Sequence, residues 1–197
     1  MLVLRKAIKS LHARKDLAYG GSWKRRGERI SVIPNLARKV DRLTTYVENS
    51  SVMADEHILD TALDLYVYGI KYLLLLAESN PSLEAELPLV TAVHPLSDNE
   101  GNFDQLVDAG KYEANHYAPI DTIIAHISSL FEELWPCVES GGALEARFSL
   151  AKRLADVSEL LLVQIAHDFP GAVETFTHRE LPSIEMRTDA HVKDLQG

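Results

Sequence analysis

Hydrophobic residues recur at helical spacing along most of the chain. Leucine, isoleucine and valine repeat at intervals of three and four residues, the pattern of a helix with one buried face. Four long segments carry it: about 35–48, 55–78, 119–135 and 144–167. Shorter helices are expected over 2–15 and 103–109, and residues 17–34 have the composition of a loop. Because no strand alternation competes, we expect an all-α fold, a helical bundle of four or five long helices.

Prolines, glycines and changes in polarity divide the chain into four parts. We expect a helical region over 1–80, an irregular connection over 81–118, a second helical pair over 119–170 that packs on the first, and a tail or arm over 171–197. Pro136 should end the helix that starts near 119, because proline removes a backbone donor from a helix interior. From Thr175 onward the chain is polar and lacks periodicity, which predicts the tail.

The predicted helix over 55–78 is mostly apolar but carries a row of acids. Glu56, Asp60 and Asp64 are four residues apart, so they share one stripe of the helix. Such carboxylates repel one another unless they face water or a cation, and aspartate is a mediocre residue inside a helix. We therefore treat the three acids as candidate catalytic residues and ligands of Mg²⁺ or Mn²⁺. The alternative is that Glu56 complements the helix dipole and the others face water.

A glycine-containing segment with two aromatic residues precedes this helix. Tyr19 and Trp23 flank Gly20-Gly21-Ser22, and the basic run Lys24-Arg25-Arg26 follows. Glycine permits close backbone approach, so such a loop can stack a base and hold phosphates. In the alternative interpretation the loop is a helix connection whose aromatic residues pin it to the core.

The predicted helix over 35–48 carries a polar and basic face. Asn35, Lys39 and Arg42 lie on one side of it, and Lys71 continues the acidic stripe of the following helix. Cations beside carboxylates suit a site that binds Mg²⁺ and a polyphosphate together. The alternative is that Lys39 and Arg42 pair with the acidic helix across a seam of the bundle.

Composition narrows the function classes. The 197 residues carry a net charge of −9, which disfavours broad binding to nucleic acid. A single cysteine, Cys137, excludes an internal disulfide and a multi-cysteine zinc site. No apolar run approaches the length of a membrane span, so we expect a soluble cytoplasmic protein. The chain has neither a Walker-type phosphate loop nor a Gly-x-Ser-x-Gly elbow.

Three blocks in the first half resemble the MazG-like, nucleotide-modification-associated family. They read Lys15-Asp16-x-x-Tyr19-Gly20-x-Ser22-Trp23, then Lys39-x-x-Arg42-Leu43, then Glu56-x-x-x-Asp60-Thr61-x-x-Asp64-Leu65-x-x-Tyr68. The resemblance covers about residues 14–78. This family is related to all-α nucleoside triphosphate pyrophosphohydrolases, in which acids on two neighbouring helices bind Mg²⁺ and water attacks a phosphoryl group.

The resemblance implies roles for individual residues. Glu56, Asp60 and Asp64 would be metal ligands or would orient water, while Lys39 and Arg42 would face phosphate. Tyr19 and Trp23 would line a nucleotide pocket, and a homo-oligomer is expected. The family's best-known enzymes also carry a Glu-Glu-x-x-Glu block on the preceding helix, where this chain has only Asp41 before Glu48.

Two functions from different classes are therefore expected. The first is an Mg²⁺-dependent nucleotide-binding protein that hydrolyses a phosphoanhydride bond. The second is a non-catalytic interaction module that keeps the fold and binds another protein. The enzyme requires the three carboxylates to converge near Lys39 or Arg42 around an open cleft.

Overall fold

A computed structural model confirms the all-α fold. It describes residues 1–48, 55–112 and 118–181, with the backbone alone at 55–57. Eight α-helices occur in these ranges: α1 Leu2–Tyr19, α2 Ile33–Glu48, α3 Asp55–Ala77, α4 Pro81–Glu84, α5 Glu100–Asp108, α6 Ile120–Glu139, α7 Leu144–Asp168 and α8 Pro170–Glu180. Three short turns join them: the 3-10 turns η1 Gly20–Lys24 and η3 Leu96–Asp98, and the π-helical turn η2 Glu28–Val32. No β-strand is present in the described ranges.

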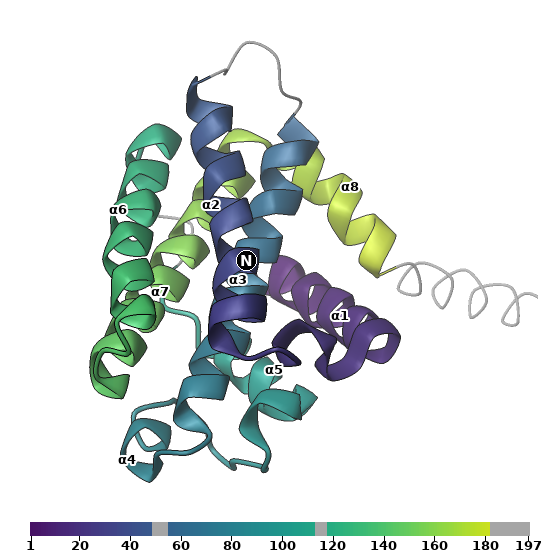
Figure 1. The fold of residues 1–197 in the computed structure, drawn as a ribbon. Coiled ribbons are helices and arrows are strands. Elements are labelled where there is room, and N and C mark those ends of the chain that lie inside the picture. The colour runs from purple at the N-terminus through teal and green to yellow at the C-terminus, as the bar shows by residue number, and fades with distance from the viewer. Residues whose placement is uncertain (49–54, 113–117, 182–197) are drawn as a thin grey trace, which may run out of the picture.

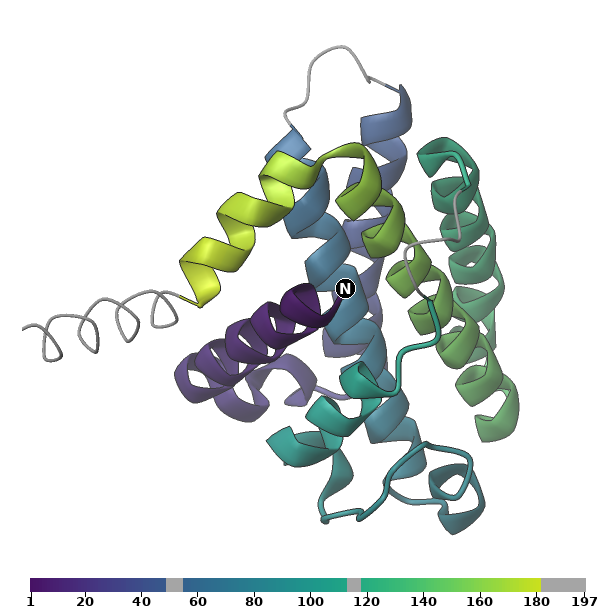
Figure 2. The same ribbon diagram turned by 180° about the vertical axis from the view of Figure 1, so that it is seen from behind.

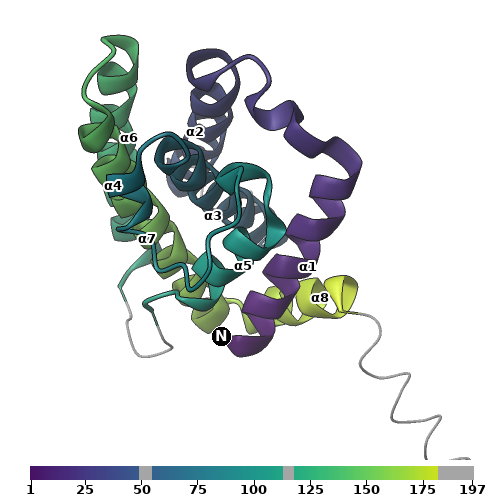
Figure 3. The same ribbon diagram turned by 90° about the horizontal axis from the view of Figure 1, so that it is seen from below.

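Helices α2, α3, α6 and α7 form a four-helix bundle. Helix α3 packs against α7, α7 packs against α6, and α2 contacts both α3 and α6 (Figure 1). Helices α1, α5 and α8 lie together on the other side of α3, as the view from behind shows (Figure 2). From below, α1 is on the opposite side of the molecule from α6 (Figure 3). Within the described ranges, no helix combines the length and apolarity needed to cross a membrane.

Helix α3 is buried on most of its circumference because apolar residues occupy nearly every position after Ile58. Its closest neighbour is α7, and Gly69 permits the approach. A Cβ atom at Gly69 would lie 3.4 Å from the Cα and Cβ atoms of Ala155. Small residues at a helix crossing let the two backbones come close, so the pair fixes how α3 packs on α7.

A polar triad attaches the turn η2 to two helices. Tyr72, which has no exposed surface, donates a hydrogen bond to Glu28, and Arg147 of α7 forms an ion pair with the same carboxylate. Burial raises the pKa of the Tyr72 hydroxyl, and the hydrogen bond to Glu28 raises it further. The chain between α1 and α2 is therefore held against the bundle.

Three segments differ from the sequence-based expectation. Helix α1 extends to Tyr19, and Gly20, with φ of 48°, then turns the chain into η1, so residues 17–34 are not an open loop. Pro136 does not end α6, which runs on to Glu139, because the turn after the proline is still closed by the hydrogen bond from the Ser140 N–H to the Pro136 carbonyl. Residues 170–180 form α8, where a tail was expected from 171.

Helix α8 has a physical basis that periodicity does not reveal. Pro170 occupies its first turn, a position at which proline is favoured. Its buried residues are only Phe176 and Glu180. One aromatic anchor and one buried carboxylate replace the apolar stripe that a sequence pattern would detect.

The contact between Gly69 and Ala155 gives a stability prediction. Gly69→Ala should leave the free energy of unfolding unchanged or raise it by up to about 1 kcal/mol, because alanine has the better helix propensity and its Cβ just fits. Gly69→Leu should lower it by about 1–3 kcal/mol through overpacking. Urea denaturation followed by circular dichroism measures both. Equal stabilities of the Ala and Leu variants would contradict the close crossing.

Candidate functional site

A cavity of about 360 Å³ opens between α1, η1, α2 and α3. Lysines, aspartates, aromatic residues and one histidine make up most of its wall. The lining residues are His12, Lys15, Asp16, Tyr19, Gly20, Ser22, Trp23, Lys39, Asp64, Val67, Tyr68 and Lys71. The three lysines against two aspartates leave one positive charge on the wall.

Most of the sequence-predicted site residues meet at this cavity. They are Tyr19, Trp23, Lys39, Asp64 and Lys71. They come from four separate elements, so the fold brings the aromatic segment, the basic face of α2 and the acidic helix together at one cavity.

Other predicted residues lie elsewhere. Asn35 does not line the cavity: its amide donates to the Ser31 carbonyl at 2.7 Å and its oxygen accepts from Arg38. Arg42 is exposed and also outside the lining. Asp60 is 59% exposed at its side chain and forms an ion pair with Arg179 of α8 at 3.4 Å. The side chain of Glu56 lies outside the described residues.

The cavity carboxylates are each held by lysines from other helices. Asp64 on α3 receives Lys15 from α1 at 2.6 Å on Oδ1, and Lys39 from α2 lies 3.6 Å from Oδ2. Asp16 on α1 receives Lys71 from α3 at 2.8 Å. The described members of the acidic row, Asp60 and Asp64, are thus neutralised by the protein's own cations.

Aromatic rings complete the wall. The Lys39 ammonium lies 5.0 Å from the centre of the Tyr68 ring, and the Lys71 ammonium lies 5.0 Å from the centre of the Trp23 ring. The Trp23 and Tyr68 rings meet edge to face at 6.4 Å. Trp23 is 7% exposed, so it pins η1 to the core and also faces the cavity. The interpretation in which an aromatic residue pins the segment to the core is thus confirmed for Trp23, while stacking of a base on it stays a prediction. Tyr19 is 70% exposed at the rim.

Burial changes the acid–base behaviour of two facing groups. Burial lowers the pKa of Lys39. The Asp64 carboxylate opposes this shift, whereas the guanidinium groups of Arg38 and Arg42 lower the pKa further. Burial raises the pKa of the Tyr68 hydroxyl, with Asp64 adding to the effect and Arg38 opposing it. Arg38 and Arg42 thus lie close enough to add positive potential, although neither lines the cavity.

His12 is a cavity residue that sequence reasoning missed. It is 4% exposed, its ring stacks on Phe103 with centres 3.7 Å apart, and its Nδ1 has no hydrogen-bond partner. Burial, together with the nearby Lys71 ammonium, lowers its pKa to about 4, and the Asp16 carboxylate opposes this shift. The ring is therefore neutral at pH 7. No local pattern identified His12, because its partner Phe103 is far away in the sequence.

The described carboxylates do not fit the expected metal cage. Both oxygens of Asp64 face lysine ammonium groups, and Asp60 turns to Arg179 outside the cavity. In the part of the chain that the structure describes, no group of three or more His, Cys, Asp or Glu residues is arranged to hold a metal ion. Asp64 and Lys39 do meet at the cavity, which is the part of the expected convergence that these residues reproduce.

Comparison of the chain with protein-family models, with curated proteins and with solved structures found no match. The site is therefore interpreted from its own geometry. Its features are a polar cavity, an excess of ammonium groups and aromatic rings within reach of them.

The lowered pKa of His12 predicts a pH-dependent stability. Its value is about 4 in the fold against 6.5 in the unfolded chain, so the unfolded state binds the extra proton between these limits. The free energy of unfolding should fall as the pH drops from 6.5 to 4, by up to about 3 kcal/mol from this group. His12→Phe should flatten that slope in urea titrations at several pH values. His126→Gln, at an exposed position, should leave the slope unchanged, and equal slopes for wild type and His12→Phe would contradict the assignment.

Proposed function

We propose that the cavity binds a nucleotide or a closely similar phosphorylated aromatic compound. The observation that carries the proposal is the convergence of Lys15, Lys39 and Lys71 with the rings of Trp23 and Tyr68 on one cavity. Its volume of about 360 Å³ is within the range of small-molecule sites.

The lysines supply the anion-binding half of the site. An ammonium group is a compact donor of three hydrogen bonds and a common partner of phosphate. Lys39 and Lys71 are largely buried, with 11% and 9% of their side chains exposed, so a phosphate near them would interact with little screening by water. In the absence of a ligand, the carboxylates of Asp64 and Asp16 hold these ammonium groups in place. A phosphate group carries more negative charge and can replace the carboxylates as the partner of the lysines.

The aromatic residues supply the other half. Trp23 and Tyr68 are held in fixed orientations by each other and by the lysines beside them, while the exposed ring of Tyr19 stands at the rim. A planar base can stack on such rings, and stacking contributes about 1–3 kcal/mol per base in sites of this kind.

Magnesium dependence and phosphoanhydride hydrolysis stay predictions of the sequence resemblance. The described residues supply Asp16 and Asp64 as cavity carboxylates, and each is paired with lysine. Assembly into a homo-oligomer likewise stays a prediction. A screen of nucleotides with and without Mg²⁺ or Mn²⁺, read by pyrophosphate and phosphate release, tests the activity.

Lys39→Met should weaken nucleotide binding. Removing one buried ammonium group from the phosphate half should raise Kd at least about tenfold, which corresponds to about 1.4 kcal/mol. Isothermal titration with ATP, GTP, CTP, UTP and their monophosphates measures the affinity. Lys152→Met is the matched control, because Lys152 also lies over an aromatic ring, 5.9 Å from the centre of Phe148, but outside this cavity. The proposal fails if wild-type protein binds none of these nucleotides, or if the two variants bind them equally.

Asp64→Asn separates direct phosphate binding from metal binding. If the lysines hold the phosphates, the variant should bind nucleotide about threefold or more tightly without Mg²⁺, since a competing negative charge is gone. Titrations of wild type and variant in EDTA and in MgCl₂ measure this. If Asp64 instead ligates Mg²⁺, the variant loses an Mg²⁺-dependent gain in affinity that the wild type shows.

A further inference from the structure

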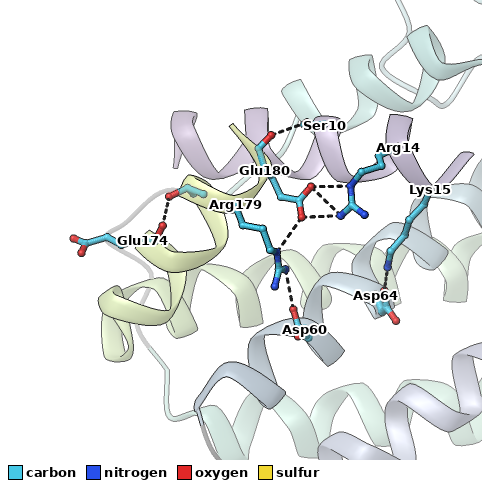
Figure 4. A network of polar contacts seen from close by, with 9 residues as sticks. Ser10, Arg14, Lys15, Asp60, Asp64, Glu174, Arg179 and Glu180 are labelled. Carbon is cyan, nitrogen blue, oxygen red and sulfur yellow. Dashed lines mark hydrogen bonds and ion pairs between the residues drawn. The ribbon is translucent and has the colours of Figure 1, made fainter. Parts of the chain in front are cut away.

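Helix α8 fastens α1 through a single buried carboxylate. The Glu180 side chain is 2% exposed and accepts hydrogen bonds from Arg14 at 2.8 and 3.0 Å, and from the Nε of Arg179 at 3.1 Å (Figure 4). Its backbone carbonyl also accepts from the Ser10 hydroxyl at 2.9 Å. Two successive turns of α1 are thus bonded to the last residue of α8.

The fastened helix is one wall of the cavity. Lys15, Asp16 and Tyr19 of α1 line it; Lys15 and Asp16 directly follow Arg14 in the sequence, and Tyr19 ends the helix. Helix α1 packs mainly against α8 and α5 and makes few contacts with α3, which forms the opposite wall. The separation of the two walls therefore depends on the elements that hold α1 from outside as well as on the two ion pairs between α1 and α3.

The same network reaches α3 directly. Arg179, which bonds to Glu180, also donates to Asp60 at 3.4 Å, and Lys15 pairs with Asp64 one turn further along α3 (Figure 4). Consecutive members of the acidic row thus bind α8 and α1. Two contacts therefore set the position of α1 relative to α3. The Lys15–Asp64 pair lies at the cavity, and the chain of contacts from Asp60 through Arg179 to Glu180 lies outside it.

We propose that α8 is a clamp, made of Ser10, Arg14, Asp60, Arg179 and Glu180, that positions the α1 wall and couples its own docking to ligand binding. Glu180 is a positioning residue, because it acts on the cavity through Arg14 and α1. Coupling between sites is reciprocal: if an intact clamp favours the binding geometry, a bound ligand favours a docked α8 by the same factor. The clamp is then a place from which occupancy of the cavity can be regulated.

The first test needs no ligand and uses Trp23 as a reporter of the cavity. Trp135 is the other tryptophan, so Trp135→Phe leaves Trp23 as the only source of indole fluorescence. In that background, Arg14→Gln should raise the acrylamide quenching constant of Trp23 at least about twofold, because the wall loosens locally. Arg14 is itself 62% exposed, and the buried Glu180 carboxylate keeps its hydrogen bond from Arg179 when Arg14 is replaced. Asp60→Asn, at the outer link, is a second variant expected to act in the same direction.

Two variants make this test specific. Arg14→Lys keeps a cation beside Glu180 and should restore most of the protection. Arg153→Gln removes an arginine of similar exposure, which pairs at 3.8 Å with the exposed Glu133 between α7 and α6, and should leave quenching unchanged. Equal quenching in Arg14→Gln, Asp60→Asn and Arg153→Gln, with urea midpoints matched, would overturn the clamp.

The second test addresses coupling and rests on the proposed function. With ATP as the probe, Arg14→Gln should raise Kd at least about fivefold, and saturating ATP should slow amide hydrogen exchange over 177–181 in wild type but not in the variant. Unchanged affinity together with increased Trp23 quenching would overturn the coupling. Absence of ATP binding by the wild type would instead count against the proposed function, and the quenching arm would still decide whether α8 positions the wall.

Discussion

The cavity depends on keeping three ammonium groups close together in a partly buried space. Lys15, Lys39 and Lys71 would repel one another and draw back into water if nothing opposed them. Asp64 forms ion pairs with Lys15 and Lys39, and Asp16 forms one with Lys71. Each pair joins two different helices. Because the pairs are between elements, the same contacts that neutralise charge also set the distance between α1, α2 and α3. Fold and site are therefore maintained by one set of interactions.

The sequence predicted this arrangement where local order was enough. The helical period identified the buried faces of α2, α3, α6 and α7, and the family resemblance implied that Trp23, Lys39 and Asp64 share one site. Such features follow from residues that are close in the chain or from the packing of neighbouring helices. The expected choice between water and a bound cation for the acidic row was too narrow. The pairing of Lys39 with Asp64 matches the alternative in which the basic helix pairs with the acidic helix across a seam of the bundle. The pairs of Asp64 with Lys15 of α1 and of Asp60 with Arg179 of α8 were not expected, because spacing on one helix cannot reveal them.

The missed features share a dependence on distant partners. Helix α8 is held by Phe176 and Glu180, and the partner of Glu180 on α1 is more than 160 residues away. His12 owes its neutrality to burial against Phe103 and beside Lys71. In both cases the residue types are ordinary, and only tertiary contacts give them their role. A lone histidine or glutamate in a polar stretch carries no signal of this kind.

The close approach of Gly69 to Ala155 has a consequence for the opposite side of α3. A helix that meets its neighbour through a small residue cannot turn about its own axis without a clash, so the crossing with α7 fixes the angle at which α3 faces the rest of the protein. The same helix carries Asp64, Tyr68 and Lys71, all within two turns of Gly69. The direction of these side chains is thus determined by a contact that contains no charge and lies on the other face of the helix.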